Sequence, residues 1–238
     1  MIKNILTHNR ECINIELDTA EKRQYFSPAT YADYKVTKPL IEKYARGKLL
    51  DVGCGHMPFK QLISRYVERY ETFDTQEHTG GVTYIGDIQN MRQISDNLYD
   101  SLVCFEVLEH VPDPFKAMQE IQRIVKKDGI VLITVPHLSR LHELPHDYYR
   151  YTRYGLKYLL ERNGFSVLEM HQRGGLFCFL GHQWSMIFVG LFWGLPIFKK
   201  IIFFLNKWLC VKPSCWIDRK LDKEGLFALG YSVAAKKN

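Results

Sequence analysis

The sequence predicts an α/β fold with a mostly parallel sheet, and three observations predict it. Apolar runs of strand length alternate with stretches of helical pattern across residues 30–171, as in strand–helix–strand units with right-handed crossovers. The apolar run that starts at Lys48 ends in Gly53-Cys54-Gly55 and then Pro58, as a buried strand, a tight turn and a helix start would. A final apolar run at 226–235 follows a long hydrophobic segment. With 238 residues, of which 46% are hydrophobic, the chain can form one large domain or one domain with an insertion.

The individual elements follow from local pattern. A helix is expected over residues 30–45, before the first strand. Proline suits the first turn of a helix, so 58–67 is predicted as the first crossover helix. A helix over 153–162 is expected to begin after Thr152 as its cap and to end at Asn163-Gly164. The other predicted elements are a helix at 115–127, the turn Lys127-Asp128-Gly129, and strands at 69–73, 82–86, 98–105, 130–135, 165–171 and 226–235.

Residues at the carboxyl ends of the predicted strands suggest a nucleoside-binding pocket. Gly53 and Gly55 can adopt positive φ and let a ligand approach the backbone. Asp74 ends the second strand about 20 residues after this turn, where a carboxylate can accept both hydroxyls of a ribose. Proteins that bind NAD share this feature with proteins that bind S-adenosylmethionine (SAM). Asp87 follows the third strand, where it could cap the next turn.

Several of these stretches resemble one family. Leu50-Asp51-Val52-Gly53-Cys54-Gly55 resembles the first motif of class I SAM-dependent methyltransferases. Phe73-Asp74, Gly86-Asp87-Ile88 and the stretch 99–111 with Glu106-Val107-Leu108-Glu109-His110 match the same family in order. The resemblance implies a Rossmann-like, seven-stranded, mostly parallel sheet with an antiparallel last strand, and SAM as cofactor. It also assigns cofactor-binding residues: Asp51, Gly53 and Gly55 at the methionine part, Asp74 at the ribose, Asp87 and Ile88 at the adenine, Phe105 in the pocket wall, and Cys54 and Thr75 as further cofactor-binding residues.

The loop at 136–151 is the richest in chemistry. Histidine, carboxylate and tyrosine side chains together suit hydroxyl recognition and proton transfer. The predicted substrate-binding residues are His142, Asp147, Tyr148, Tyr149 and Arg150. Candidates for a general base are His110, His137 and His146. The loop resembles the His-Asp-Tyr-Tyr-Arg-Tyr-Thr stretch of methyltransferases encoded with glycan-assembly enzymes, which implies a glycan or lipid-linked acceptor beside other small molecules, methylated on a hydroxyl.

A hydrophobic insertion precedes the last strand. Residues 174–198 contain no Asp, Glu, Lys or Arg and are long enough to span a bilayer. Because 226–235 is expected to return to the sheet, the insertion must begin and end on the same side of any membrane, which excludes a single crossing. A dip into one leaflet fits better, with tryptophans at the interface and the lysines and arginines of 199–223 at anionic lipid heads. The alternative is a helical subdomain over the substrate site or between protomers.

Composition bounds the partners and the compartment. The formal net charge of +6 suggests an acidic partner, which could be nucleic acid, an anionic membrane or an anionic substrate. The six cysteines form no CxxC pair, and no His/Cys cluster has zinc spacing, so no metal site is expected. The first residues lack the apolar core of a signal peptide. We therefore expect a cytoplasmic protein, and the insertion adds the expectation of peripheral contact at the inner face of a membrane through 174–223.

The expected organisation has four parts: an N-terminal helical cap at 1–45, a SAM-binding core at 46–173, the helical insertion at 174–224 and the last strand at 225–238. A nucleic-acid methyltransferase is one alternative, and the sequence argues against it. Amino-methylating DNA enzymes carry Asn/Asp-Pro-Pro-aromatic after the fourth strand, where this chain has Phe105-Glu106-Val107-Leu108. A non-catalytic, membrane-associated scaffold is a second alternative. An NAD oxidoreductase is a more distant one because Pro58 stands where the dinucleotide fingerprint has its third glycine.

Overall fold

The computed structural model describes the chain except residues 1–7, 10–11, 14, 79 and 223, and except the side chains of 196–198. The chain divides into two compact units. The first comprises residues 1–36 and 172–229, and the second comprises 37–171 and 230–238. The second unit holds most of the sheet, and the first is helical.

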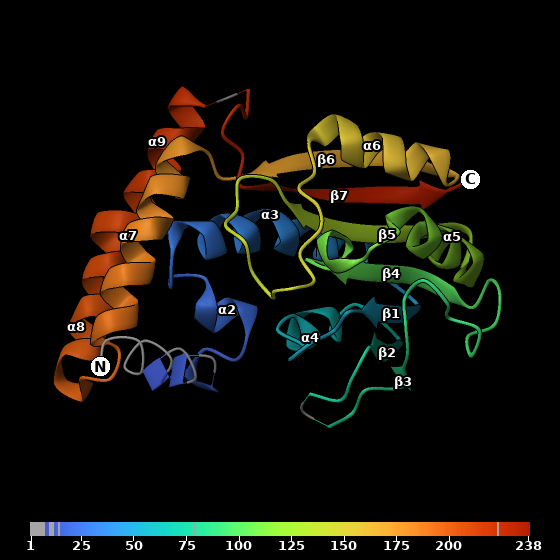
Figure 1. The fold of residues 1–238 in the computed structure, drawn as a ribbon, viewed down its shortest axis with the longest axis horizontal. Helices are drawn as coiled ribbons and strands as arrows, with labels where there is room; N and C mark the ends of the chain where they lie inside the picture. Colours follow the sequence, from blue (N-terminus) through green and yellow to red (C-terminus); the bar gives the residue numbers. More distant parts are fainter. Residues whose placement is uncertain (1–7, 10–11, 14, 79, 223) are drawn as a thin grey trace. The chain divides into compact units, whose positions relative to one another are not determined.

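The sheet has seven strands in the order β3-β2-β1-β4-β5-β7-β6 (Figure 1). The strands are β1 (Lys48–Val52), β2 (Arg69–Asp74), β3 (Tyr84–Ile85), β4 (Tyr99–Phe105), β5 (Val125–Pro136), β6 (Phe165–Arg173) and β7 (Gly230–Lys237). Strands β1 to β5 pair in parallel, and β7 pairs with β5 in the antiparallel direction. This topology confirms the predicted Rossmann-like sheet with an antiparallel last strand.

The central strands explain why the sheet is stable. Leu49, Leu50 and Val52 of β1 are fully buried, as is most of β4 and β5. Near-continuous apolar runs are typical of parallel strands that are covered on both faces. Helix α5 (Pro114–Ile124) begins at the cap Asp113, whose side chain accepts the backbone N–H of Lys116. Its buried residues recur at helical spacing along one face.

Several boundaries differ from prediction. Only Lys60–Ile63 of the predicted helix 58–67 is helical (α4). The next turn tightens, because Arg65 and Tyr66 donate to carbonyls three residues back rather than four. Strand β3 has two residues, not the five predicted at 82–86. Strand β5 starts at Val125, with a register shift instead of a separate turn before residue 130.

The predicted start of the last strand at 226 was also wrong, because β7 begins at Gly230. The carboxylate of Asp222 explains the difference. It accepts the backbone N–H groups of Leu226 and Phe227 at 2.9 and 3.1 Å and holds them in a turn. By contrast, α6 (Arg153–Arg162) has the predicted bounds, with Thr152 accepting the N–H of Gly155 as its cap. Helix α3 (Pro28–Tyr44) begins two residues earlier than the predicted 30–45.

The helical unit contains α2 (Ala20–Arg23), α7 (Leu176–Phe192), α8 (Pro196–Leu205), the π-helical η2 (Asn206–Val211) and α9 (Lys212–Leu221). Buried polar contacts fix α7. The carboxylate of Asp218 on α9 accepts the N–H groups of Phe177 and Cys178 at 2.8 Å each, and so caps the first turn of α7 from another helix. None of the helices in the described part of the chain is both long and apolar enough to cross a bilayer.

Candidate active site

A cavity of about 750 Å³ opens at the carboxyl ends of β1, β2 and β4. This is the edge at which open α/β sheets bind their ligands. Its lining includes Gly53, Gly55, Asp74, Thr75, Asp87, Ile88, Glu106, Val107, His110, Glu143, His146 and Tyr148. Six of the nine predicted cofactor residues are in this lining, as are two of the three candidate bases and one of the five predicted substrate-binding residues.

The two glycines of the turn have different tasks. Gly53 has φ +68°, and a Cβ there would lie 2.3 Å from Cγ2 of Val107, so packing excludes any side chain. Its N–H donates to the carbonyl of Phe73 at 2.8 Å, which joins the turn to β2. Gly55 also has positive φ, but among the described residues other than its chain neighbours no heavy atom lies within 4 Å of the place where its Cβ would be. The backbone at Gly55 is therefore open to a ligand in the cavity.

Asp74 is held in place without being saturated. One carboxylate oxygen accepts the N–H of Gly55 at 2.8 Å, and the other accepts the N–H of Thr75 at 2.7 Å. His78 Nε2 lies 3.4 Å from the second oxygen. The hydroxyl of Thr75 also donates to this second oxygen, at 3.3 Å. The oxygen that accepts from Gly55 has this one hydrogen bond among the described residues, so Asp74 keeps acceptor capacity there for a ribose hydroxyl.

Asp87 is exposed and both caps a turn and lines the cavity. Its Oδ1 accepts the backbone N–H of Gln89 at 2.9 Å. The neighbouring Ile88 is buried and gives the same part of the cavity an apolar wall. The two interpretations of Asp87 that the sequence left open therefore do not exclude one another.

The other three predicted cofactor residues, Asp51, Cys54 and Phe105, are not among the lining residues. Asp51 is buried in β1, where its carboxylate accepts the hydroxyl of Tyr70. Burial raises the pKa of Asp51 to about 7, and the Tyr70 hydrogen bond opposes the shift only in part. Burial likewise raises the pKa of Cys54 to about 12. Phe105 packs edge-on against Phe59, with the ring centroids 5.3 Å apart.

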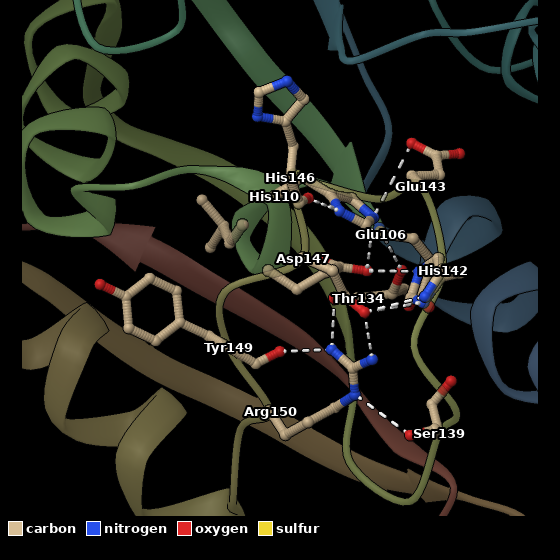
Figure 2. A network of polar contacts seen from close by, with 12 residues as sticks. Glu106, His110, Thr134, Ser139, His142, Glu143, His146, Asp147, Tyr149 and Arg150 are labelled. Carbon is tan, nitrogen blue, oxygen red and sulfur yellow. Dashed lines mark hydrogen bonds and ion pairs between the residues drawn. The ribbon is translucent and has the colours of Figure 1, made fainter.

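The loop after β5 is tied to itself by Arg150 (Figure 2). The guanidinium donates to both carboxylate oxygens of Asp147, at 2.6 and 2.7 Å, and to the carbonyl of Arg140 at 2.9 Å. The guanidinium holds the pKa of Asp147 well below its usual range. Tyr149 donates its hydroxyl to the carbonyl of Pro112. These predicted substrate-binding residues therefore shape the loop, while Tyr148 lines the cavity.

The three candidate bases differ in position. His110 and His146 both line the cavity, and His110 Nδ1 lies 2.5 Å from the carbonyl of His146. His146 Nδ1 lies 3.2 Å from the hydroxyl of Tyr148. His137 is not in the lining, and its ring packs near Tyr231 at a centroid distance of 5.9 Å.

Sequence reasoning missed several residues of the site. His56, His78, Gln89, Glu106 and Glu143 line the cavity, although none was predicted to do so. Glu106 and Glu143 carried one usable signal, since each is an acidic residue in a loop after a predicted strand. The expectation of no metal site rested on spacing alone. The structure brings ligand atoms of Glu109, His110 and His142 within 4.8 Å of one another.

Comparison with known proteins relates the chain to methyltransferases. A family model described as a methyltransferase domain matches residues 22–170. The ubiquinone biosynthesis O-methyltransferase of Actinobacillus pleuropneumoniae is 28% identical over 147 residues, covering 50% of this chain and 63% of that protein. The enzyme of the same name from Proteus mirabilis is 32% identical over 100 residues, covering 37% and 41%. The chain thus spans less than two thirds of the length of these curated relatives.

Solved structures show the same fold at low identity. A SAM-dependent methyltransferase from Archaeoglobus fulgidus aligns with a TM-score of 0.55 at 18% identity, covering 87% of this chain and 92% of that one. A SAM-dependent methyltransferase from Mesorhizobium loti gives 0.54 at 11% identity, covering 87% and 98%. A cyclase gives 0.56 at 16% identity, covering 84% and 80%, so this fold alone does not fix the reaction.

The cavity fits the cofactor of this family. Its volume is within the range of small-molecule sites. Gly55 leaves the backbone open, Asp74 keeps acceptor capacity for a ribose, and Ile88 supplies an apolar wall for a base. The match to more than half of the chain, together with the sheet order and this cavity, shows that the chain belongs to the methyltransferase domain family and uses SAM as its cofactor.

Proposed function

We propose that this protein transfers the methyl group of SAM to a hydroxyl of a small-molecule acceptor, and that the acceptor is lipid-linked or otherwise apolar. The observation that carries the proposal is the meeting of His110, His146 and Tyr148 with Gly55 and Asp74 in one cavity. The curated relatives are named as O-methyltransferases, which favours oxygen as the acceptor atom.

Each group of residues has a part in this reaction. Bound SAM would supply a methyl group attached to a sulfonium sulfur. The acceptor oxygen would form a bond to the methyl carbon, and the carbon–sulfur bond would break with its electron pair left on sulfur. Asp74 would hold the ribose, with Thr75 beside it, and Asp87 and Ile88 would contact the adenine. Holding acceptor and cofactor in one geometry can supply about 7–11 kcal/mol of the barrier.

We assign removal of the acceptor proton to His146. Its ring lies in the cavity lining, and its Nδ1 contacts a tyrosine hydroxyl rather than a backbone carbonyl. Imidazole is the side chain best suited to accept a proton near neutral pH. His146→Gln should lower kcat by about 100-fold or more while leaving SAM affinity unchanged. The matched control is His137→Gln, because His137 does not line the cavity.

The helical unit supports a membrane-associated acceptor. On α7, Leu180, Trp184, Ile187 and Phe188 are each about half exposed or more and recur at helical spacing. Basic side chains border exposed tryptophans on the following helices. Lys212 Nζ lies 3.6 Å from the ring centroid of Trp208, and Lys220 Nζ lies 4.1 Å from that of Trp216. An apolar helix face with tryptophan and lysine beside it suits the interface of an anionic bilayer.

The cofactor part is tested by calorimetric titration with SAM, S-adenosylhomocysteine and NAD. Wild-type protein should bind the first two and not NAD. Asp74→Ala should weaken SAM binding by about 10-fold or more, since every 1.4 kcal/mol is a factor of ten. Asp18→Ala, which removes an exposed ion pair with Lys22, is the matched control. A folded wild-type protein that binds no SAM would contradict the proposal.

The membrane part is tested by flotation with vesicles that contain phosphatidylglycerol, at low and high salt. Wild-type protein should float at low salt, and Trp184→Ser combined with Phe188→Ser should abolish flotation. Tyr158→Ser removes an equally exposed aromatic residue from α6 and should change nothing. If folded wild-type protein stays at the bottom at low salt, the acceptor is not presented by an anionic membrane.

A further inference from the structure

A buried carboxylate beside the cavity has no role in the reaction described so far. Glu109 lies in the short 3-10 helix η1 (Leu108–His110) directly after β4, and its side chain is fully buried. Neither of its carboxylate oxygens has a hydrogen-bond partner among the described residues. A buried charge without partners is costly, so the ionised form of this carboxylate needs a counter-charge or a ligand.

Two imidazoles face this carboxylate. His110 Nε2 lies 3.7 Å and His142 Nε2 lies 3.8 Å from the same oxygen of Glu109. The two rings meet edge to face, with centroids 4.7 Å apart. These distances are too long for hydrogen bonds. They match the separation of roughly 3–4 Å between ligand atoms that share one cation at about 2.0–2.2 Å.

The other nitrogen of each ring, Nδ1, contacts a backbone carbonyl, and this contact determines the tautomer of the ring. His110 Nδ1 lies 2.5 Å from the carbonyl of His146, and His142 Nδ1 lies 3.2 Å from the carbonyl of Arg140. A carbonyl only accepts, so each Nδ1 carries a proton. In the neutral tautomer that has this proton, the lone pair of Nε2 is directed toward Glu109 and can bind a metal ion. Histidine ligands of metals are oriented by backbone carbonyls in the same way. Figure 2 shows His110 and His142 turned toward one another from η1 and the 137–151 loop.

We propose that Glu109, His110 Nε2 and His142 Nε2 bind one divalent transition-metal ion. Two imidazoles and one carboxylate suit Zn²⁺, Co²⁺ and related ions better than Mg²⁺. His110 also lines the cavity, and the exposed carboxylate of Glu143 lies 4.0 Å from His110 Nε2. The ion would therefore sit at the cavity edge, with open positions toward the acceptor.

This arrangement narrows the class of acceptor, a point that rests on the proposed methyl transfer. A hydroxyl or phenol oxygen that occupies an open position on a divalent cation loses its proton more readily. The proton would pass to His146, and the oxygen would then attack the methyl carbon. The structure thus favours an acceptor whose hydroxyl can ligate a metal. Binding of the ion itself does not depend on methyl transfer.

The test is titration of tag-free, EDTA-treated, full-length protein with Zn²⁺ by calorimetry and with Co²⁺ by visible absorption. One ion should bind per chain, and Co²⁺ should give the visible bands of nitrogen and oxygen coordination. Glu109→Gln and His142→Ala should each weaken binding by roughly 100-fold or more. His171→Ala, which removes an exposed histidine paired with Glu169, is the matched control and should bind as wild type does.

Two results would overturn the metal site. One is wild-type protein that binds neither ion, which would mean that a bound proton, and not a metal ion, balances the charge of the Glu109 carboxylate beside the two histidines. The other is binding that persists in His142→Ala, a variant that keeps the proposal testable if Glu109→Gln does not fold. SAM titration of the same samples separates this inference from the proposed function, because a protein that binds SAM but no metal loses only the metal site.

Discussion

At the scale of single residues, the two glycines of the first turn should respond differently to substitution. Both have positive φ, but only at Gly53 would a Cβ meet Val107, at 2.3 Å. Gly53→Ala should therefore lower the free energy of unfolding and SAM affinity together. Gly55→Ala should lower SAM affinity with the smaller loss of stability, because its Cβ would enter open space. Urea unfolding and SAM titration of both variants check this, and equal losses of stability would contradict it.

Asp51 gives a pH dependence with a defined sign. Burial raises its pKa to about 7 in the folded protein, whereas the unfolded value is near 3.8. Between these two values the folded state binds more protons than the unfolded state, so stability falls as the pH rises through this range. A pKa that differs by one between the folded and unfolded states changes the free energy of unfolding by about 1.4 kcal/mol.

Asp51→Asn removes this dependence but keeps an acceptor for the Tyr70 hydroxyl. The variant should therefore be more stable than wild type at pH 8, and its advantage should shrink toward pH 4. Urea unfolding at pH 4, 6 and 8 measures the difference. Stability curves that run parallel for the two proteins would show that Asp51 is not titrating as expected.

At the scale of elements, the 137–151 loop depends on the planar fork of Arg150. Lysine would keep the charge but not the paired bonds to Asp147 or the bond to the Arg140 carbonyl. Arg150→Lys should therefore increase opening of the loop. The amides of His142 and Tyr151, which donate to Asp147 and to the Pro136 carbonyl, should exchange about 10-fold faster or more. Amides of β4 serve as the internal control, and unchanged exchange in the loop would exclude this role of Arg150.

Elements were predictable where the signal was local. The cap Thr152 and the stop at Asn163-Gly164 gave α6 its bounds, and the apolar runs gave β1, β2 and β4. The prediction was wrong at 226–229 because the cause is a side-chain contact that local pattern does not show. Asp222 holds residues 226–229 in a turn, although the side chains of these four residues suit a strand.

The candidate site was also predictable only where its residues follow from local sequence pattern. Gly53, Gly55 and Asp74 lie where strand ends put them, so order along the chain was enough to find them. The cluster of Glu109, His110 and His142 could not be found this way, because the loop after β5 brings His142 back to η1. A search of the sequence for metal-ligating residues at characteristic spacings detects sites whose residues lie in one element or turn. It does not detect ligands that a fold gathers from two strand ends.

At the scale of the whole molecule, the chain leaves the sheet after β6 and returns as β7, which lies between β5 and β6. Sequence pattern predicted the return but treated 1–45 and 174–224 as separate parts. The structure groups 1–36 with 172–229, since Ile13 and Phe26 form one buried cluster with Val189 and Trp193. Such contacts between distant segments leave no periodic signal in the sequence.

This organisation predicts that the SAM site survives removal of the insertion. The ends of the excised segment are close, because the N–H of Leu229 donates to the carbonyl of Arg173 at 2.9 Å. A short glycine-serine linker in place of 174–228 can therefore join β6 to the chain that leads into β7. The cavity lining lies entirely in the unit formed by 37–171 and 230–238, so SAM affinity should stay within about threefold of wild type.

The same excision should abolish vesicle flotation, because it removes the exposed faces of α7, η2 and α9. Calorimetry with SAM and flotation on one preparation measure both effects, and circular dichroism checks that the sheet remains. A folded, excised chain that no longer binds SAM would mean that the helical unit takes part in the cofactor site. A chain that still floats would move the membrane contact to the sheet unit, where the basic residues rather than the tryptophans would have to provide it.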